Sequence, residues 1–534
     1  MSHRRLIATA AMLAAGLVLI PATAQAAGPA PVPRSSDAEA LSKSSAFRTF
    51  SSPAGPSVRP RTAAGALSVD LEAYGISGRG IELAADLGGA PAGTSVSIAW
   101  GDGSVSTATS GLVEGGHNVA SAQHSYPKLG SYTITVTAGS GGTTASNSVE
   151  VTTAGSHYTP YGPTRLMDTR ERGKVQGWSS VKLRIGGNGG IPAGVTAVVL
   201  NVTVTEAESA GFLTAFPYGG NRPATSNVNF TAGQTVPNMV IVPVGADGSV
   251  QLYNGSGGAV QMIADVSGYF TQSVSSGYTP VPPARLVDTR DGLGAPRGQI
   301  AGRGSIPVQV AGVGRLPGAG ITAVALNVTA TESRNQGFLT VHPSGTARPN
   351  ASNLNFGTGQ TIANSVVVPV GSDGKIQVFN GSGDPADVIV DVVGYYSADG
   401  NSSYLPIDPE RLADTRTAEW SSTPVPGGGY LPLALGDGMP GVTGFVLNTT
   451  VTGTRSAGFL TVAPDPNSLA QYQDRTAVWP DRPTVSSLNW QRPGATVPNL
   501  VQAVPGPYGI VDFWNAGGGD ADLVVDMFGY YDKS

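Results

Sequence analysis

Short runs in which apolar and polar residues alternate fill the chain from about residue 66 to its end. Residues 132–137 read YTITVT, which has the period of two expected of a half-buried strand. Similar runs, including AVVLNVTV, GFLTAFP and SVQLYN, follow with Gly, Pro, Asn or Asp between them. No segment in this part of the chain sustains a helical period. The pattern predicts an all-β protein built from β-sandwich domains in tandem.

A threefold repeat divides the second part of the chain into units at residues 158–272, 278–398 and 404–532. Each unit begins with Tyr-x-Pro and RLxDTR, continues through GFLT, and ends on a strand with an aspartate and an aromatic pair. At about 115–130 residues, a unit has the size of a domain rather than of a solenoid repeat. Its seven or eight short runs predict a jelly-roll or immunoglobulin-like sandwich, with a β-trefoil as the secondary alternative. The short junctions suggest a stiff string of domains.

Two motifs precede the repeats, WGDGS at residues 100–104 and HSYPKLGSYTITVTA at residues 124–138. They resemble those of the PKD domain, an immunoglobulin-like β-sandwich common in extracellular proteins. This resemblance implies a sandwich over residues 66–153 that acts as a spacer or a weak interaction module. The three later units resemble the RLxDTR-type repeats of secreted actinobacterial, Streptomyces-like proteins, some of which are appended to cell-wall or polysaccharide hydrolases. That second resemblance implies no particular activity.

The first 26 residues have the pattern of a cleaved secretory signal: a basic start, an apolar run and the small-x-small sequence AQA. The apolar run is short for a membrane-spanning helix, so a retained anchor is the less favoured alternative. Residues 27–65 lack a sustained apolar period and are predicted to be a disordered linker. The chain contains no cysteine, which excludes disulfides and thiolate metal sites. We expect a secreted, extracellular protein, with association to the cell surface as a further possibility.

Charge is sparse and slightly acidic. Only 13% of the residues are charged, so uncharged polar residues must cover much of the surface. The formal net charge is −5, and it becomes −10 without residues 1–65, which hold seven cationic and two acidic residues. Nucleic-acid binding requires clustered cations. We therefore expect no nucleic-acid partner, and no membrane insertion once the signal is cleaved.

The sequence shows no arrangement typical of catalysis. Gly-x-Ser-x-Gly, HExxH and phosphate-loop motifs are absent, and no histidine recurs between the repeats. Carboxylates precede GFLT at Glu206, Glu208 and Glu332, but the third unit has none there, which disfavours a glycosidase. A fold copied three times favours binding, because copies supply surface and avidity. We expect no enzyme activity and no cofactor, with a cell-wall or polysaccharide hydrolase as a distant alternative.

RLxDTR places two arginines around one aspartate at the start of each unit. The arginines lower the pKa of such a carboxyl and make it a poor proton donor. We interpret the motif as a structural clasp, in which each aspartate accepts charge-assisted hydrogen bonds from a flanking arginine or nearby backbone amides. The closing-strand aspartates Asp265, Asp391 and Asp526 would pair with the arginines, and a ligand clamp is the alternative. The clasp residues are Arg165, Asp168, Arg170, Arg285, Asp288, Arg290, Arg411, Asp414 and Arg416.

Four of the six tryptophans lie in the third unit, which also carries an insertion at residues 465–483. Trp490 and Trp514 replace Phe or Tyr of the other units and are predicted to be core residues. Trp420 and Trp479 have no aromatic counterpart and are the candidate ligand-binding residues, since exposed loop aromatics can stack on sugar rings. Calcium at Asp102 rests on the PKD resemblance alone, and a simple turn is favoured there.

These observations predict a secreted, non-catalytic binding or adhesion protein. Its expected partner is the cell wall, an extracellular polysaccharide or a surface protein. The alternative is a purely structural spacer or coat protein without a specific ligand.

Overall fold

The computed structural model describes residues 48–52, 66–420, 422–436 and 439–534. Strands dominate, and the helical segments of this part, η1 (Thr169–Glu171), η2 (Ala418–Trp420) and α2 (Leu469–Gln473), are short. The all-β prediction is confirmed. Over the same ranges, the structure contains no helix with the length and apolar character needed to cross a membrane. The predicted signal at residues 1–26 and most of the predicted linker at 27–65 lie outside the described residues.

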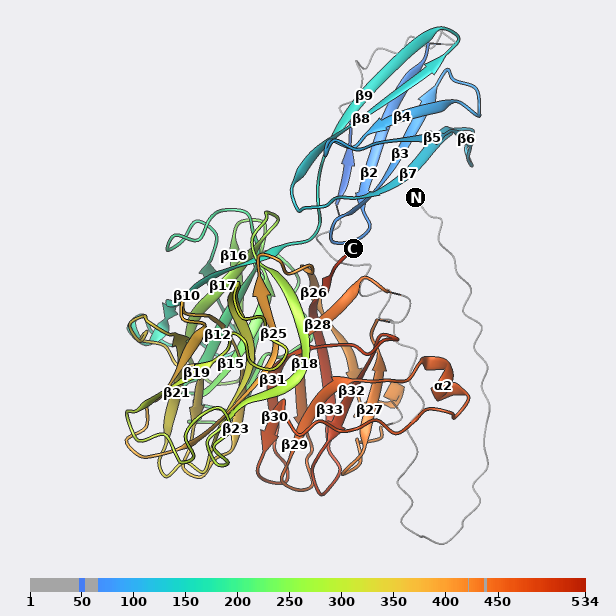
Figure 1. The fold of residues 1–534 in the computed structure, drawn as a ribbon. Coiled ribbons are helices and arrows are strands. Elements are labelled where there is room, and N and C mark those ends of the chain that lie inside the picture. Colours follow the sequence, from blue (N-terminus) through green and yellow to red (C-terminus); the bar gives the residue numbers. More distant parts are fainter. Residues whose placement is uncertain (1–47, 53–65, 421, 437–438) are drawn as a thin grey trace.

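Two sheets form an N-terminal sandwich, which stands at the top of Figure 1. One sheet holds β1 (Thr49–Ser51), β2 (Ser68–Gly75), β3 (Gly80–Gly88), β7 (Asn118–Ser125) and β6 (Gly111–Leu112). The other holds β5 (Val105–Thr109), β4 (Ser95–Ala99), β8 (Ser131–Ser140) and β9 (Thr143–Thr152). The side chains of Trp100 and Tyr126 lie in the core between them. Strand β1 belongs to the predicted linker, so the disorder prediction is wrong for these three residues, which pair with β2.

Each repeat is an eight-stranded jelly roll of two four-stranded antiparallel sheets. In the first repeat one sheet has the order β10 (His157–Asp168), β17 (Gln261–Thr271), β12 (Val195–Thr205) and β15 (Val236–Pro243). The other has the order β11 (Ser180–Arg184), β16 (Ser249–Asn254), β13 (Gly211–Pro217) and β14 (Val228–Phe230). First and last strands are neighbours, and successive strands alternate between the two sheets except for β13 and β14, which pair in one sheet, as in a jelly roll. Of the two predicted sandwich types, the immunoglobulin-like one is therefore wrong for the repeats.

The second and third repeats reproduce this topology. We call the sheet that faces the other repeats the inner sheet. In the second repeat its order is β18 (Gly277–Asp288), β25 (Asp387–Ser397), β20 (Ile321–Thr331) and β23 (Ile362–Pro369). In the third repeat its order is β26 (Ser403–Asp414), β33 (Asp522–Asp532), β28 (Val442–Thr452) and β31 (Val497–Ala503). The outer sheet of the second repeat has the order β19 (Ser305–Gln309), β24 (Lys375–Asn380), β21 (Gly337–Pro343) and β22 (Leu354–Phe356). The outer sheet of the third has the order β27 (Tyr430–Ala434), β32 (Ile510–Asn515), β29 (Gly458–Pro464) and β30 (Leu488–Trp490).

The three jelly rolls close into a ring around a pseudo-threefold axis, and we call this ring the hub. The prediction of a stiff string of domains is wrong. The segments that enter the repeats form antiparallel bridges with one another: Tyr158 with Ser276, Tyr278 with Ser402, and Tyr404 with Ser156. The third repeat is thereby joined to the first. In Figure 1 the third repeat, orange to red, stands beside the first two, which overlap in this view, and all three lie beneath the N-terminal sandwich.

A second hydrophobic core lies on the axis, where the three inner sheets meet. Its members come from all three repeats: Tyr158, Ala197, Val199, Met239, Ile241, Phe270, Tyr278, Ala323, Ala325, Val367, Tyr396, Tyr404, Val446, Leu500, Phe528 and Tyr531. The hydroxyl groups of Tyr396 and Tyr531 are 2.6 Å apart, and Gln502 donates to both. Burial of this shared apolar surface stabilises the ring in addition to the separate core of each repeat.

A cyclic set of asparagine hydrogen bonds also joins the repeats. The Asn of each NVT or NTT motif donates to a backbone carbonyl of the next repeat: Asn201 to Ser352, Asn327 to Ser486 and Asn448 to Ser226, at 2.6, 2.5 and 2.6 Å. Its side-chain oxygen accepts from Asn364, Asn499 and Asn238, each at 3.0 Å. These six side chains are buried. Buried amides require partners, so the network fixes how neighbouring repeats align.

Apart from the edge strand β10, the inner-sheet strands of the first repeat have apolar residues on both faces, and this second apolar face is what the ring buries. Along β12, Val198 and Leu200 point into the core of the first repeat, whereas Ala197 and Val199 point toward the axis. A sheet with one solvated face shows alternation, but a sheet buried on both faces reads as a continuous apolar run. The continuous apolar run AVVL in β12 therefore indicates that this strand packs on both faces, against the core of its own repeat and against the other repeats.

The N-terminal sandwich is attached to the hub near the end of the chain. The Arg79 amide donates to the Ser534 carbonyl at 2.9 Å, and the Gly155 amide donates to the Gly78 carbonyl at 2.8 Å. A Cβ at Gly78 would lie 2.4 Å from Oγ of Ser403, so any larger residue there would displace this hydroxyl. Residues 78–79, the start of the first repeat and the C-terminus therefore form one junction.

Candidate functional site

The RLxDTR residues form three equivalent clusters of charged side chains. In the second repeat, Arg285 donates to Asp391 through Nε at 2.9 Å and to Asp288 at 3.0 Å. Arg290 donates to Asp288 through Nε and a terminal nitrogen, at 2.9 and 2.7 Å. Hydrogen bonding from Arg290 lowers the pKa of Asp288, whereas burial raises the pKa of Asp391 against the effect of Arg285. Each aspartate accepts charge-assisted hydrogen bonds from at least one arginine, and these bonds connect the first and last strands of the repeat.

The first and third clusters repeat these contacts. Arg165 donates to Asp265 and Asp168, and Arg170 donates to Asp168. Arg411, Asp414, Arg416 and Asp526 are arranged in the same way. Two of the clusters also reach the next repeat, since Arg285 donates to the Thr484 carbonyl and Arg411 to the Ala224 carbonyl, both at 3.3 Å. The cluster joins the first and last strands of a repeat and touches its neighbour, and the inter-repeat contact was not expected from the sequence.

The tryptophans of the third repeat separate into buried and exposed ones. Trp490 and Trp514 are 3% and 2% exposed, as predicted for core residues. Trp420 is partly buried and packs against the core of the third repeat. Trp479 is 47% exposed. Of the two predicted ligand-binding residues, Trp479 is thus the one that presents a large open ring.

The insertion holds Trp479 in a fixed position. Its ring stands edge-on against Tyr430 and Trp514, with centroids 5.0 and 5.6 Å away. Asn467 donates to the Val478 carbonyl at 2.9 Å and accepts from the Val478 amide at 2.8 Å, which fixes the preceding backbone. In the other repeats an arginine covers the equivalent outer-sheet ring, Arg222 over Tyr253 and Arg348 over Phe379. In the third repeat the indole of Trp479 stands against the equivalent ring, that of Trp514, and the corresponding arginine, Arg482, lies over Phe459 instead, 5.9 Å from the ring centroid.

Two buried carboxyl groups lie where the insertion meets the outer sheet, one from the first residue of the insertion and one from β32. Asp465 and Asp512 are both fully buried. Asp465 accepts from the Asn467 amide at 2.5 Å and from the Tyr472 hydroxyl. Both oxygens of Asp512 lack a hydrogen-bond partner among the described residues. Burial, and then the neighbouring Asp465, raise the pKa of Asp512 to about 10, so Asp512 is protonated at neutral pH.

Trp178 is an exposed aromatic residue that the sequence reasoning missed. It is 65% exposed and has a φ of 58°, in the left-handed region. Its equivalents before β19 and β27 are Arg303 and Gly428, with φ of 61° and 77°. A bulky residue in this conformation is strained, and such strain is often kept for function. The available signal was the comparison of this one position in the three loops, where glycine stands only in the third, at Gly428.

Replacing Trp178 by glycine should stabilise the protein. A left-handed residue other than glycine costs about 1–2 kcal/mol, and glycine's extra entropy in the unfolded chain offsets part of the gain. We expect Trp178→Gly to raise the urea midpoint by an amount equivalent to about 0.5–1 kcal/mol, with Trp178→Ala as the control that removes the ring but keeps the strain. A lower midpoint for both variants would mean that the indole packs onto the protein.

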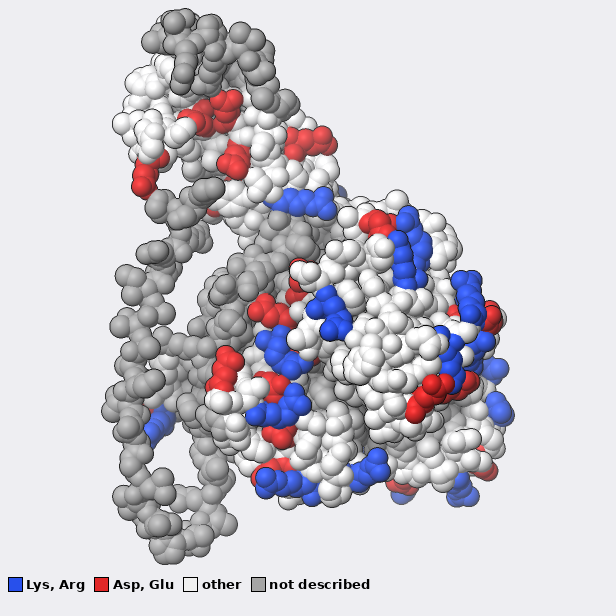
Figure 2. Space-filling model, turned by 180° about the vertical axis from the view of Figure 1, so that it is seen from behind, with Lys and Arg blue, Asp and Glu red and all other residues white. Residues whose placement is uncertain are grey.

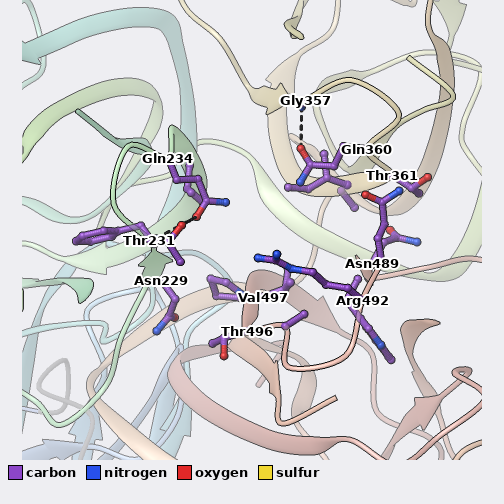
Figure 3. Close-up of a pocket in the computed structure, with 18 of the residues that line it drawn as sticks. Asn229, Thr231, Gln234, Gly357, Gln360, Thr361, Asn489, Arg492, Thr496 and Val497 are labelled. Carbon is purple, nitrogen blue, oxygen red and sulfur yellow. Dashed lines mark hydrogen bonds between the residues drawn. The ribbon is translucent and has the colours of Figure 1, made fainter. Parts of the chain in front are cut away.

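A cavity of about 660 Å³ lies on the pseudo-threefold axis, and we call it the axial cavity. Equivalent loops line it, those between β14 and β15, β22 and β23, and β30 and β31 (Figure 3). Val236 at this end of β15 pairs with Val204, whereas Pro243 at the other end pairs with Ala197 near the entering segments. The cavity is therefore at the end of the hub remote from the N-terminal sandwich.

The remaining sequence candidates occupy structural positions. Asp102 accepts from Ser104 and lies 2.8 Å from His124 Nε2, and these contacts outweigh burial and lower its pKa to about 2. The His124 ring stacks on Trp100. In the described ranges, three or more His, Asp or Glu residues do not gather as a metal site would require. Glu208 pairs with Lys174 at 3.0 Å on the surface.

Charged groups are scattered over the surface. Figure 2 shows the back face, where charged side chains lie in small groups, several of mixed sign, with broad uncharged areas between them. Some pairs form ion bridges, such as Lys182 with Asp247 at 2.6 Å. Uncharged polar and apolar groups thus dominate the face that a partner would meet there.

Comparison with protein-family models and with curated proteins gives no match. Among solved structures, one describes the triple jelly-roll fold and turret assembly of an archaeal virus, with 12% identity, 76% of this chain and 88% of that chain covered, and a TM-score of 0.15. Another describes Sulfolobus turreted icosahedral virus, with 11% identity, 76% and 89% coverage and a TM-score of 0.15. A third is PNGF-II, with 10% identity, 91% and 97% coverage and a TM-score of 0.13. Since scores this low carry no argument, the fold is assigned from its own topology: one β-sandwich followed by three jelly rolls.

Proposed function

We propose that the protein is a secreted, non-catalytic binding protein that attaches to cell-wall or other extracellular polysaccharide. One observation carries this proposal: Trp479 offers an open indole ring on a loop whose backbone is fixed by Asn467. A ring held in place before binding loses little entropy when a sugar stacks on it. The secretory pattern of the first 26 residues gives the location in which such polymers occur.

The ring architecture agrees better with binding than with spacing. Three jelly rolls placed end to end would extend the molecule, but around one axis they add little length. The ring instead gathers three equivalent sets of loops at one end of the hub. Gathered loops favour recognition of one surface or polymer, because linked sites raise the effective concentration of each other. The alternative, an architectural coat component without a specific ligand, predicts no binding to purified polymers.

Trp479→Ala should weaken polysaccharide binding about tenfold, the equivalent of ~1.4 kcal/mol. The test is co-sedimentation of the mature chain with peptidoglycan, chitin and cellulose. Tyr508→Ala is the matched control, because Tyr508 is an exposed aromatic residue of the same repeat, 54% exposed and outside the insertion. A variant at Trp420 is less informative, since this residue packs against the core.

Three results would contradict the proposal. The intact chain binds none of the polymers, Trp479→Ala binds as strongly as the unchanged chain, or the chain degrades a polymer. Melting curves of both variants are recorded alongside, so that weaker binding is not confused with unfolding.

A further inference from the structure

The loops of the axial cavity direct hydrogen-bond donors toward the axis. In the first repeat, Oε1 of Gln234 accepts from the backbone amide of Thr231 at 3.1 Å. In the second, Oε1 of Gln360 accepts from the Gly357 amide at 2.8 Å. These bonds use the side-chain oxygens to close each loop. The NH₂ groups of both glutamines have no protein partner within the described residues and remain available as donors.

The third loop departs from this symmetry. It has six residues between β30 and β31, where the other two loops have five, and it contains Arg492. Its loop-closing bond comes from Thr454, whose hydroxyl accepts from the Ala495 amide at 2.9 Å. The third loop also holds Gln491, but the Nε2 of Gln491 donates to the Gly359 carbonyl of the second repeat at 2.8 Å. The long donor side chains without a protein partner are therefore Gln234, Gln360 and Arg492, one from each repeat, and the third is a guanidinium in place of an amide.

Arg492 is the single ionisable side chain among the described residues that line the cavity. Its guanidinium forms no ion pair or hydrogen bond within the described part of the chain. Figure 3 shows the side chain extending into the space between the loops of the first and second repeats. A cation without a neighbouring carboxylate favours an anionic ligand, and guanidinium matches a carboxylate with two parallel hydrogen bonds.

Other lining residues suit the remainder of a sugar. Carboxamide and hydroxyl groups come from all three repeats, among them Asn229, Thr231, Thr361, Asn489 and Thr496. Val236, Ile362 and Val497 supply equivalent apolar contacts. The volume lies within the range of about 300–1,000 Å³ found for ligand pockets, which combine apolar walls with a few polar groups.

We propose that the axial cavity binds one carboxylate-bearing saccharide per chain, with the carboxylate on Arg492 and hydroxyl groups on Gln234 and Gln360. The inference rests on the proposed function and adds to it a second binding site, whose ligands are acidic saccharides. Because only one of the three loops carries a cation, the ligand has one orientation and one copy, although the hub has three repeats. This site is separate from Trp479, which packs on the outer sheet of the third repeat.

Isothermal titration of the mature chain with trigalacturonate and with its carboxyl-reduced form, the neutral galactose trimer, tests the inference. We expect one trigalacturonate per chain, and at least tenfold weaker binding of the neutral trimer. Arg492→Ala should weaken trigalacturonate binding at least tenfold, and Arg492→Lys less, because lysine keeps the charge but loses the paired hydrogen bonds. Arg455→Ala is the control, since this exposed arginine pairs with Asp520 outside the cavity.

Equal binding of both trimers, unchanged binding by Arg492→Ala, or three ligands per chain would each overturn the inference. Absence of trigalacturonate binding would overturn it as well. Trp479→Ala separates this failure from that of the proposed function. Suppose that the chain co-sediments with a polymer and loses this binding in Trp479→Ala, but that Arg492→Ala binds trigalacturonate as tightly as the unchanged chain. In that case only the inference about the axial cavity fails. Trp479→Ala should leave trigalacturonate binding unchanged. All variants are compared by melting temperature, which Arg492→Ala should not alter because the side chain is exposed and unpaired.

Discussion

Asp288→Asn in the full chain is expected to lower the stability of the hub by about 3 kcal/mol. Asp288 is 1% exposed and receives hydrogen bonds from Arg285 and Arg290. Its replacement by a neutral side chain leaves two arginines with too few partners, and breaking a buried pair on one side costs about 3–5 kcal/mol. We take the lower end of this range, because the side chain of Arg290 is 38% exposed. The free energy of unfolding is measured by urea denaturation.

The control for this variant is Asp247→Asn, which removes a surface partner of Lys182 and should leave the urea midpoint unchanged. The full chain is needed, because an isolated repeat would expose the apolar face that it buries on the axis. Unchanged stability together with lost ligand binding would instead identify the RLxDTR cluster as a ligand clamp.

Asp512→Asn is expected to stabilise the protein at neutral and alkaline pH and to flatten the dependence of its stability on pH. Asp512 has a raised pKa of about 10 in the folded state, because it is buried and lies near Asp465. In the unfolded chain an aspartate has a pKa of about 3.9. The folded state therefore retains a proton that the unfolded state has released, and the stability from this group is fully present only below about pH 4.

Stability should consequently fall as pH rises from about 4 toward 10, by at most ~1.4 kcal/mol per pH unit for this group. Asparagine keeps the shape without the proton, much like Gln251 and Gln377 at the equivalent positions of β16 and β24. Urea midpoints at pH 5, 7 and 9 measure the effect, with Asp520→Asn as the exposed control. Lower stability of Asp512→Asn at pH 9 would show that Asp512 is ionised there and has a cationic partner.

Local pattern was sufficient to predict the strands, the three units and the burial of Trp490 and Trp514. Each of these depends on residues close in sequence or on substitution between repeats. The clustering of Asp288 with Arg285 and Arg290 also follows from near neighbours. Asp391 was expected as the second partner because first and last strands of a sandwich lie side by side.

The ring was not predicted, because its contacts join residues that are far apart in the sequence. The continuous apolar runs such as AVVL, which indicate a sheet buried on both faces, resemble the alternating pattern of a sheet with one buried face. Asn201 sits in a standard strand pattern, and nothing near it indicates that Ser352 is its partner. Arg492 and Trp178 were missed for a different reason. Both residues lie in loops and differ from the residues at the equivalent positions of the other repeats. In a loop, the sequence says little about where a side chain points or how exposed it is.

Closure of the ring has a consequence for how the protein folds during its synthesis. The hydrogen bond from Asn448 to Ser226 spans 222 residues, and the one from the Arg79 side chain to the carbonyl of Lys533 spans 454. Contacts of such high sequence separation form late, since the chain between them must be ordered first. The first two repeats leave the ribosome with their axial faces exposed to solvent, and they are prone to aggregation until the third repeat packs against them. A chain truncated before residue 404 would keep that surface permanently.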